Sequence, residues 1–271
     1  MSENIVRMYR KRPKDWILKW GVFCLIVFLI AISLPYVDYK GLTSYGQIIA
    51  QSILLNIVKP DLRLLFDFST KEAVPYLLLE TACIAFLGTL IGSFLALPFA
   101  FLSSRNIVPG WVAQLGTFFI TVVRTFPPFV YGLMFIRVTG PGPFTGVLTL
   151  AVAGIGMTAK LYVEAIEDLD KGIIEALDAS GCNTIQKIRY GIIPQLMSNF
   201  ASTTIYRFEI NVKNASILGL VGAGGIGYPL ISAIGAFRWN DAGTLLFGLI
   251  VLVLIIEYLS GRLRRKLATG I

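Results

Sequence analysis

Among the charged residues in the long apolar segments of this sequence, four are candidates for function: Arg124, Arg207, Glu209 and Lys213. A charge at membrane depth costs several kcal/mol, so such a residue is a candidate for function. Arg124 also precedes the pair Pro127-Pro128 by three residues, and broken helices often form transport sites. Arginine binds phosphate-like oxyanions through its planar fork of donors. We therefore expect a substrate path at these four residues, in which Arg124, Arg207 and Lys213 could attract an anion.

The same charges could instead form structural ion pairs. Arg124 could pair with Glu80 or with Glu209. Glu209 could also pair with Lys213, four residues further along a helix. Arg207 would then be left without an obvious local partner. The sequence leaves both interpretations open.

Glycines are concentrated in the motif GAGGIG, which contains Gly222, Gly224, Gly225 and Gly227. The motif formally matches GxGxxG, but no βαβ unit surrounds it, so a dinucleotide site is a weak interpretation. Glycine also allows positive φ angles and close backbone approach. We expect a tight turn at the outer end of a helix, where it could form part of a gate.

The sequence offers little for catalysis or for metal binding. It has no His, and the spacing of its three Cys residues (Cys24, Cys83 and Cys182) fits no metal motif or disulfide framework. The phosphate-binding pattern GxxxxGK[ST] is absent as well. An intramembrane enzyme, such as a lipid-phosphate transferase, would need convergent acids, bases or metal ligands. We therefore expect a non-enzymatic chain without a cofactor of its own.

Composition places these residues in a membrane protein. The chain is 55% hydrophobic and 15% charged, whereas a soluble domain carries roughly 25% charged residues. A helix needs about 20 apolar residues to cross the hydrocarbon core. Six stretches approach this length: 16–36, 74–102, 110–138, 144–159, 195–221 and 244–256. We predict an all-α, polytopic protein with about six transmembrane helices, the third of them interrupted by Pro127-Pro128.

Two parts of the chain differ in character. Residues 1–71 read as a basic cytoplasmic tail, a first transmembrane helix and an external amphipathic segment, and residues 72–271 as the core membrane domain. The amphipathic stretch 45–58 could lie along the membrane surface or pack on the core. The first apolar helix is long for a signal peptide, so we favour an uncleaved anchor.

The net charge of +8 is explained by topology better than by nucleic-acid binding. With both termini cytoplasmic, most of the Lys and Arg residues lie on the inner side of the predicted helices. This bias agrees with the positive-inside rule. It also places the loop 163–194 in the cytoplasm.

That loop contains the stretch 175–194, EALDASGCNTIQKIRYGIIP. It resembles the coupling-loop signature of ABC importer permeases. Glu175, Ala176, Gly181, Ile193 and Pro194 are in register with that signature, and the small residue Ala179 lies on the same side. Leu177 replaces a usual Ala, and Gly191 replaces a usual aliphatic residue.

Four longer blocks resemble permeases of phosphonate ABC importers: 80–106, 124–148, 159–170 and 206–230. The resemblance implies a type I ABC importer permease in the bacterial inner membrane, surrounded by lipid. It also implies a second permease chain, with a homodimer expected, a cytoplasmic ATPase dimer that binds ATP and Mg, and an extracytoplasmic binding protein. Glu175, Ala176, Ala179, Gly181 and Pro194 would couple the chain to the ATPase. The solute implied is phosphonate or a relative such as phosphite, with methionine as the alternative for this fold.

Overall fold

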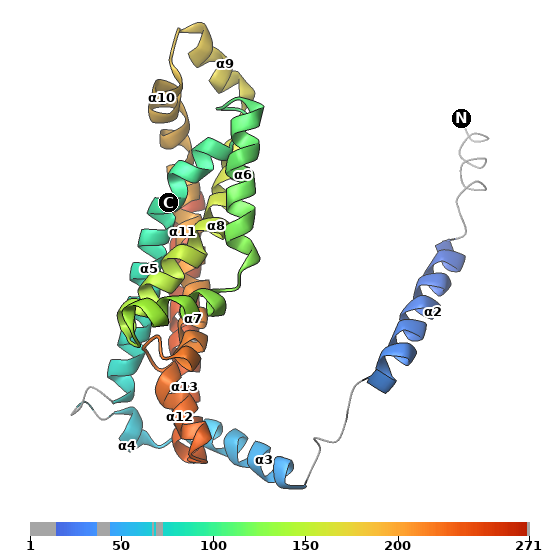
Figure 1. Ribbon diagram of the computed structural model, residues 1–271, viewed down its shortest axis with the longest axis vertical. Helices are drawn as coiled ribbons and strands as arrows, with labels where there is room; N and C mark the ends of the chain where they lie inside the picture. Colours follow the sequence, from blue (N-terminus) through green and yellow to red (C-terminus); the bar gives the residue numbers. More distant parts are fainter. Residues whose placement is uncertain (1–14, 37–43, 67, 69–72, 270–271) are drawn as a thin grey trace. The chain divides into compact units, whose positions relative to one another are not determined.

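The computed structural model describes residues 15–36, 44–66, 68 and 73–269 (Figure 1). Every regular element in these ranges is a helix, so the predicted all-α class is confirmed. By its internal contacts the chain divides into two compact units, Met1–Gln51 and Ser52–Ile271.

Some predictions fall on residues that the structure does not describe. The basic tail 1–14 lies outside the described ranges, and so do residues 37–43, 67 and 69–71 of the predicted external segment. The division of the chain into domains 1–71 and 72–271 therefore stays a prediction.

The first unit contains one apolar helix, α2 (Asp15–Ser33), followed by a 3-10 helix, Leu34–Tyr36. Residues Leu18–Tyr36 are long and apolar enough to cross a membrane, as predicted for the first span. The amphipathic stretch forms α3 (Ser44–Val58), which begins in this unit and ends in the second. A Cβ added to Gly243 would meet the backbone of Asn56, so the end of α3 packs on the core.

Three long helices form the core of the second unit: α5 (Val74–Ser103), α8 (Pro143–Glu167) and α11 (Ile193–Leu218). Two glycines let α5 and α8 approach closely. A Cβ at Gly88 would lie 2.7 Å from the Leu150 Cβ, and one at Gly92 would lie 2.7 Å from the carbonyl oxygen of Ala151. Such small-xxx-small spacing is how membrane helices gain close packing.

The predicted break at the two prolines is confirmed. Helix α6 (Gly110–Thr125) ends before them, and α7 (Pro128–Thr139) begins at the second one. The two helices are bent by 81°. Proline lacks a backbone donor and clashes with the preceding turn, so the helix cannot continue straight through this point.

Shorter helices and one long helix complete the second unit: α4 (Leu62–Leu65), α9 (Lys171–Ala179), α10 (Thr184–Gln186), the π-helix η2 (Lys187–Ile192), the 3-10 helix Gly219–Val221, α12 (Gly227–Gly235) and α13 (Trp239–Thr269). Figure 1 shows α9 and α10 together at one end of this unit and α12 at the other.

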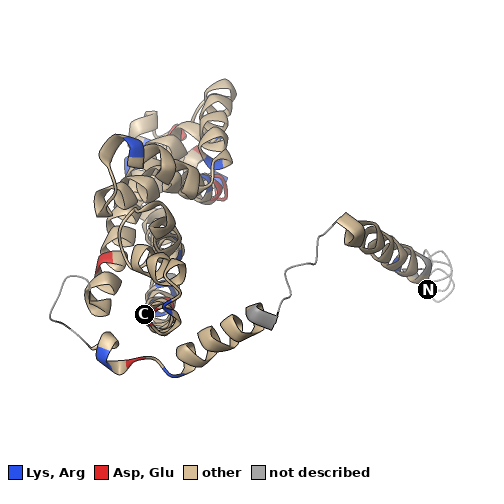
Figure 2. Ribbon diagram, turned by 60° about the horizontal axis from the view of Figure 1, so that its bottom comes forward, with Lys and Arg blue, Asp and Glu red and all other residues tan. Residues whose placement is uncertain are grey.

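Four helical stretches within the described residues are long and apolar enough to span a membrane, and the bent pair α6–α7 makes a fifth if it counts as one span. Helix α11 is long enough to be the sixth, but it carries Arg207, Glu209 and Lys213. Figure 2 shows how little of the ribbon is charged.

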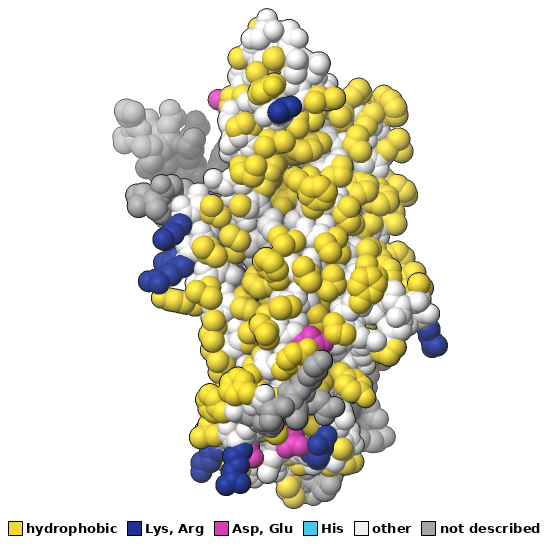
Figure 3. Space-filling model, turned by 90° about the vertical axis from the view of Figure 1, so that its left-hand side faces the viewer, with side chains coloured by type: hydrophobic (Ala, Val, Ile, Leu, Met, Phe, Trp, Pro, Cys, Tyr) yellow, Lys and Arg dark blue, Asp and Glu magenta, His cyan; other side chains and the backbone are white. Residues whose placement is uncertain are grey.

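One face of the second unit is largely apolar. Figure 3 shows hydrophobic side chains over much of the side of the second unit that α5 forms. Exposed large hydrophobic residues of this helix include Phe86, Leu90 and Phe94.

Candidate functional site

Helix α9 is capped by hydrogen bonds at both ends. Asp170 caps the start, where its side chain accepts a hydrogen bond from the Gly172 N–H at 2.9 Å. At the other end the Cys182 N–H donates to the Leu177 carbonyl at 3.0 Å, and the Gly181 N–H donates to the Asp178 carbonyl at 2.9 Å. These two bonds form a Schellman cap, which needs a left-handed residue, and Gly181 has φ +75°.

The predicted coupling residues lie on the surface, four of them in α9 and its cap and Pro194 at the start of α11. Glu175, Ala176, Ala179, Gly181 and Pro194 are all exposed. Two large apolar residues nearby are exposed too, Ile185 at 75% and Tyr190 at 65%. Exposed apolar groups next to small residues suit the close approach of another protein.

The opposite side of α9 packs on the π-helix. A Cβ at Gly191 would collide with Cδ1 of Leu177 and would reach Cγ2 of Ile173 at 4.0 Å. Lys187 adds an ion pair with Asp178. The two departures from the coupling signature, Leu177 and Gly191, are therefore one complementary contact, in which the leucine fills the space that a side chain at 191 would take.

The π-helix itself was not predicted. The Ile193 N–H donates to the Ile188 carbonyl five residues earlier, and Pro194 then supplies no donor at all. Single π turns occur often at functional sites. The one sequence signal for it was the proline directly after the loop.

We expect Gly191→Ala to weaken coupling, because the new methyl group meets Leu177. Overpacking of this kind costs roughly 1–3 kcal/mol. Leu177→Ala removes the obstacle, so Leu177→Ala/Gly191→Ala should recover uptake relative to Gly191→Ala alone. Uptake and the amount of inserted protein are measured for both single variants and the double variant. Losses that simply add would contradict the packing assignment.

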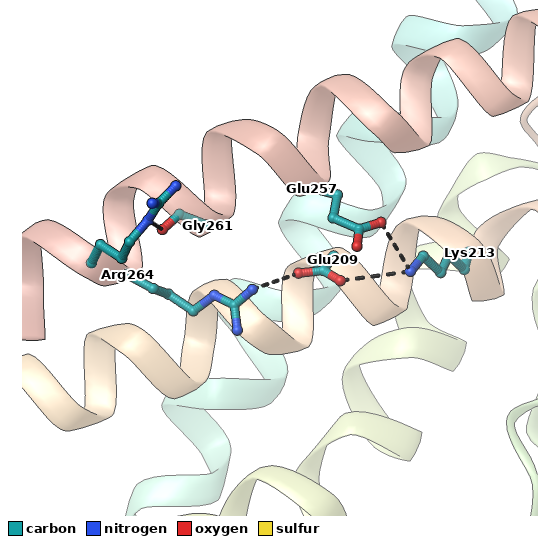
Figure 4. A network of polar contacts seen from close by, with 6 residues as sticks. Glu209, Lys213, Glu257, Gly261 and Arg264 are labelled. Carbon is teal, nitrogen blue, oxygen red and sulfur yellow. Dashed lines mark hydrogen bonds and ion pairs between the residues drawn. The ribbon is translucent and has the colours of Figure 1, made fainter.

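An ion-pair network joins α11 to α13. One oxygen of Glu209 lies 3.0 Å from Nη2 of Arg264 and the other lies 3.6 Å from Nζ of Lys213, as Figure 4 shows. Lys213 also lies 3.7 Å from Glu257. The predicted Glu209–Lys213 pair is confirmed, whereas the predicted Arg124–Glu209 pair is wrong.

The network also changes how the charges of α11 are interpreted. Glu257 and Arg264 follow the apolar stretch 244–256 of α13. Glu209 and Lys213 are therefore level with a charged part of α13 and not with its apolar part. Opposite charges nearby compensate them, which lowers the free-energy cost of placing a charge in an apolar segment. The functional prediction for these two residues depended on that cost.

Arg207 is buried, with 7% of its surface exposed. Its Nη2 donates to Oδ1 of Asn211 at 3.5 Å, and Nδ2 of Asn211 donates to Oγ1 of Thr89 at 2.9 Å. Within the described residues its Nε has no hydrogen-bond partner. Arg207 therefore has a local partner, which the sequence did not predict, but that partner is an amide and not a carboxylate.

Arg124 occupies the last turn of α6, directly before the break, and it is exposed. A Cβ at Gly156 of α8 would lie 2.6 Å from Cγ of Arg124. The aliphatic part of the Arg124 side chain therefore packs against α8. Among the described residues no carboxylate pairs with it. The alternative partner Glu80 is wrong as well, since no ion pair joins it to Arg124 in the described residues; its Oε1 accepts from the Gly225 N–H at 3.2 Å instead.

The glycine motif forms a tight turn, as predicted. Gly222, Gly224 and Gly225 have φ angles of +76°, +81° and +70°. A Cβ at Gly224 would lie 2.8 Å from the backbone of Pro143. The backbones of Gly227 and Gly219 pass so close to each other that a Cβ at Gly227 would collide with Gly219. The turn is packed against the start of α8, while its part in a gate stays a prediction.

The apolar helices that are long enough to span a membrane, with a broken helix pair among them, define a polytopic membrane protein. The chain belongs to the family of binding-protein-dependent transport system inner membrane components, whose model matches residues 88–269. It is therefore a multi-pass protein of the inner membrane that acts in transport and is not an enzyme.

Two relatives extend the match. HtxC of Stutzerimonas stutzeri, named as a phosphite transport system permease, is 35% identical over 265 residues, which cover 97% of this chain and 91% of HtxC. PhnE2 of Escherichia coli K12, named as a cryptic phosphonate transport system permease, is 41% identical over 118 residues, which cover 44% of this chain and 97% of PhnE2.

A solved structure supports the fold. A chain of the MetNI methionine ABC transporter in an inward-facing conformation matches with a TM-score of 0.63 at 22% identity, over 70% of this chain and 93% of that chain. The type I ABC importer permease fold is therefore confirmed. At this identity the match says nothing about the solute.

Proposed function

We propose that this permease carries a phosphorus oxyanion, phosphonate or phosphite, into the cell. The observation that carries the anion assignment is Arg124, an exposed guanidinium without a carboxylate partner in the described chain, placed beside a broken helix. A cation in an apolar span needs a polar partner or water, and an oxyanion in transit supplies one. The relatives are named for phosphite and phosphonate transport, so we assign the anion to the phosphorus oxyanions.

Arg207 is the second candidate for the path, because its buried guanidinium keeps an unused Nε donor. Glu209 and Lys213 instead hold α11 to α13 through their ion pairs. The glycine turn 222–227 lies on the extracytoplasmic side of the permease, where it forms part of the gate.

Energy comes from a separate ATPase dimer that binds ATP and Mg. It docks on the exposed surface of Glu175, Ala176, Ala179, Gly181 and Pro194, and both termini are cytoplasmic. An extracytoplasmic binding protein delivers the solute, and a second copy of this chain completes the path within the lipid bilayer.

The test is solute-stimulated ATP hydrolysis by the complete complex in liposomes. Phosphonate, phosphite, phosphate and methionine are supplied separately with the binding protein. We expect stimulation by phosphonate or phosphite and none by methionine, while this chain alone hydrolyses no ATP. Stimulation by methionine only would overturn the assignment.

A further inference from the structure

Three buried side chains form a chain of hydrogen bonds that links α5 to α11. Oγ1 of Thr89 donates to the Ala85 carbonyl at 2.6 Å. Nδ2 of Asn211 donates to the same Oγ1 at 2.9 Å, and Oδ1 of Asn211 accepts from Nη2 of Arg207 at 3.5 Å. Thr89, Asn211 and Arg207 expose only 3%, 1% and 7% of their surfaces. The chain therefore lies inside the second unit and ends on a cation.

Thr89 fixes the orientation of the Asn211 amide. A hydroxyl has one hydrogen to donate, and that of Thr89 goes to Ala85 in its own helix. Thr89 can then only accept from Asn211, so the amide turns its NH2 group toward Thr89 and its carbonyl oxygen toward Arg207. The opposite orientation would point the N–H donors of the amide at the N–H donors of the guanidinium. Thr89 therefore holds Arg207 in place through Asn211.

This partner of Arg207 carries no charge. An amide satisfies one donor of the guanidinium but leaves its positive charge intact, whereas a carboxylate would neutralise it. Among the described residues no Asp or Glu pairs with Arg207, and Glu209 in the same helix is paired with Arg264 and Lys213. The buried Nε of Arg207 also has no partner in the described chain. Because a buried charge is costly without a counter-ion, this arrangement favours the arrival of an anion.

Thr89 lies midway along α5 (Val74–Ser103), which is long and apolar enough to span the membrane. Solute sites of transporters often lie near the middle of the membrane. We propose that Thr89 and Asn211 are positioning residues of the anion path, which hold Arg207 by neutral contacts and so keep its charge available to the transported oxyanion. The inference rests on the proposed function, because it deepens the role of Arg207 there.

Asn211→Asp is the sharpest probe, because it keeps the shape of the side chain and gives Arg207 a carboxylate. If Arg207 were only structural, this closer partner would preserve both assembly and uptake. If Arg207 serves the anion, the new carboxylate competes with it, so uptake should fall by about tenfold while assembly is kept. Uptake of phosphite and methylphosphonate by the complete complex in liposomes is measured together with the amount of assembled complex.

Asn199→Asp is the matched control, because it adds the same charge at an exposed position of α11 and should transport like the wild type. Thr89→Ser keeps the hydroxyl and should retain more uptake than Thr89→Val, which leaves the Asn211 amide free to turn.

Wild-type uptake by Asn211→Asp overturns the inference, and so does a loss matched by less assembled complex or by an equal loss in Asn199→Asp. Equal uptake by Thr89→Ser and Thr89→Val would remove Thr89 from the proposal. If the wild-type complex took up neither phosphite nor methylphosphonate, the proposed function itself would be refuted.

Discussion

Gly181→Asp should abolish transport and leave the amount of inserted protein unchanged. Gly181 is exposed, and no atom lies within 4 Å of the position that a Cβ would take, so the new side chain projects outward from the end of α9. It would place a carboxylate beside Ala176 and Ala179, on the surface that we assign to the ATPase. A buried, unpaired charge at a protein interface costs several kcal/mol, which is enough to prevent docking.

Gly181→Asn is the matched control, because it adds a side chain of the same size without the charge. Asn and Asp both tolerate the left-handed conformation, so the backbone cost of the two variants is similar. Uptake and co-purification of the ATPase are measured for each. We expect a loss of more than about tenfold with Asp and a much smaller loss with Asn. Equal losses would mean that Gly181 matters only as a helix cap.

The parts of the fold that depend on local sequence were predictable. A run of about 20 apolar residues is typical of a transmembrane helix, and two adjacent prolines interrupt a helix. The positive φ angles at Gly222, Gly224 and Gly225 follow from the same kind of local rule, since only glycine enters that region freely. Spacing of four residues likewise predicted the Glu209–Lys213 pair.

Contacts between distant segments were not predictable in this way. Glu209 is bonded to Arg264, which is 55 residues away in the sequence, and Asn211 is bonded to Thr89, which is 122 residues away in the sequence. Helical periodicity says which residues share a face but not which helix that face meets. The contact of Leu177 with Gly191 was visible in the sequence only as two departures from a signature, and the fold was needed to show that they compensate each other.

Arg124→Gln should lower solute uptake by about tenfold without reducing the assembled complex. The structure offers Arg124 no carboxylate among the described residues, so the change leaves no acid unpaired and should not weaken the fold. It removes a planar cation that a transported oxyanion would meet at the break between α6 and α7, and charge-assisted hydrogen bonds of that kind contribute about 1.5–3 kcal/mol. Uptake and assembled complex are measured in parallel.

Glu209→Gln should show the opposite pattern. Only 10% of the Glu209 side chain is exposed, so its loss leaves Arg264 and Lys213 without their common partner, although both cations are partly in contact with solvent. The cost should therefore fall between that of a surface pair and that of a buried pair, roughly 1–3 kcal/mol, and appear as less assembled complex. If Arg124→Gln also reduced assembly, or left uptake unchanged, Arg124 would have no place on the anion path. The phosphorus assignment would then depend on the relatives alone.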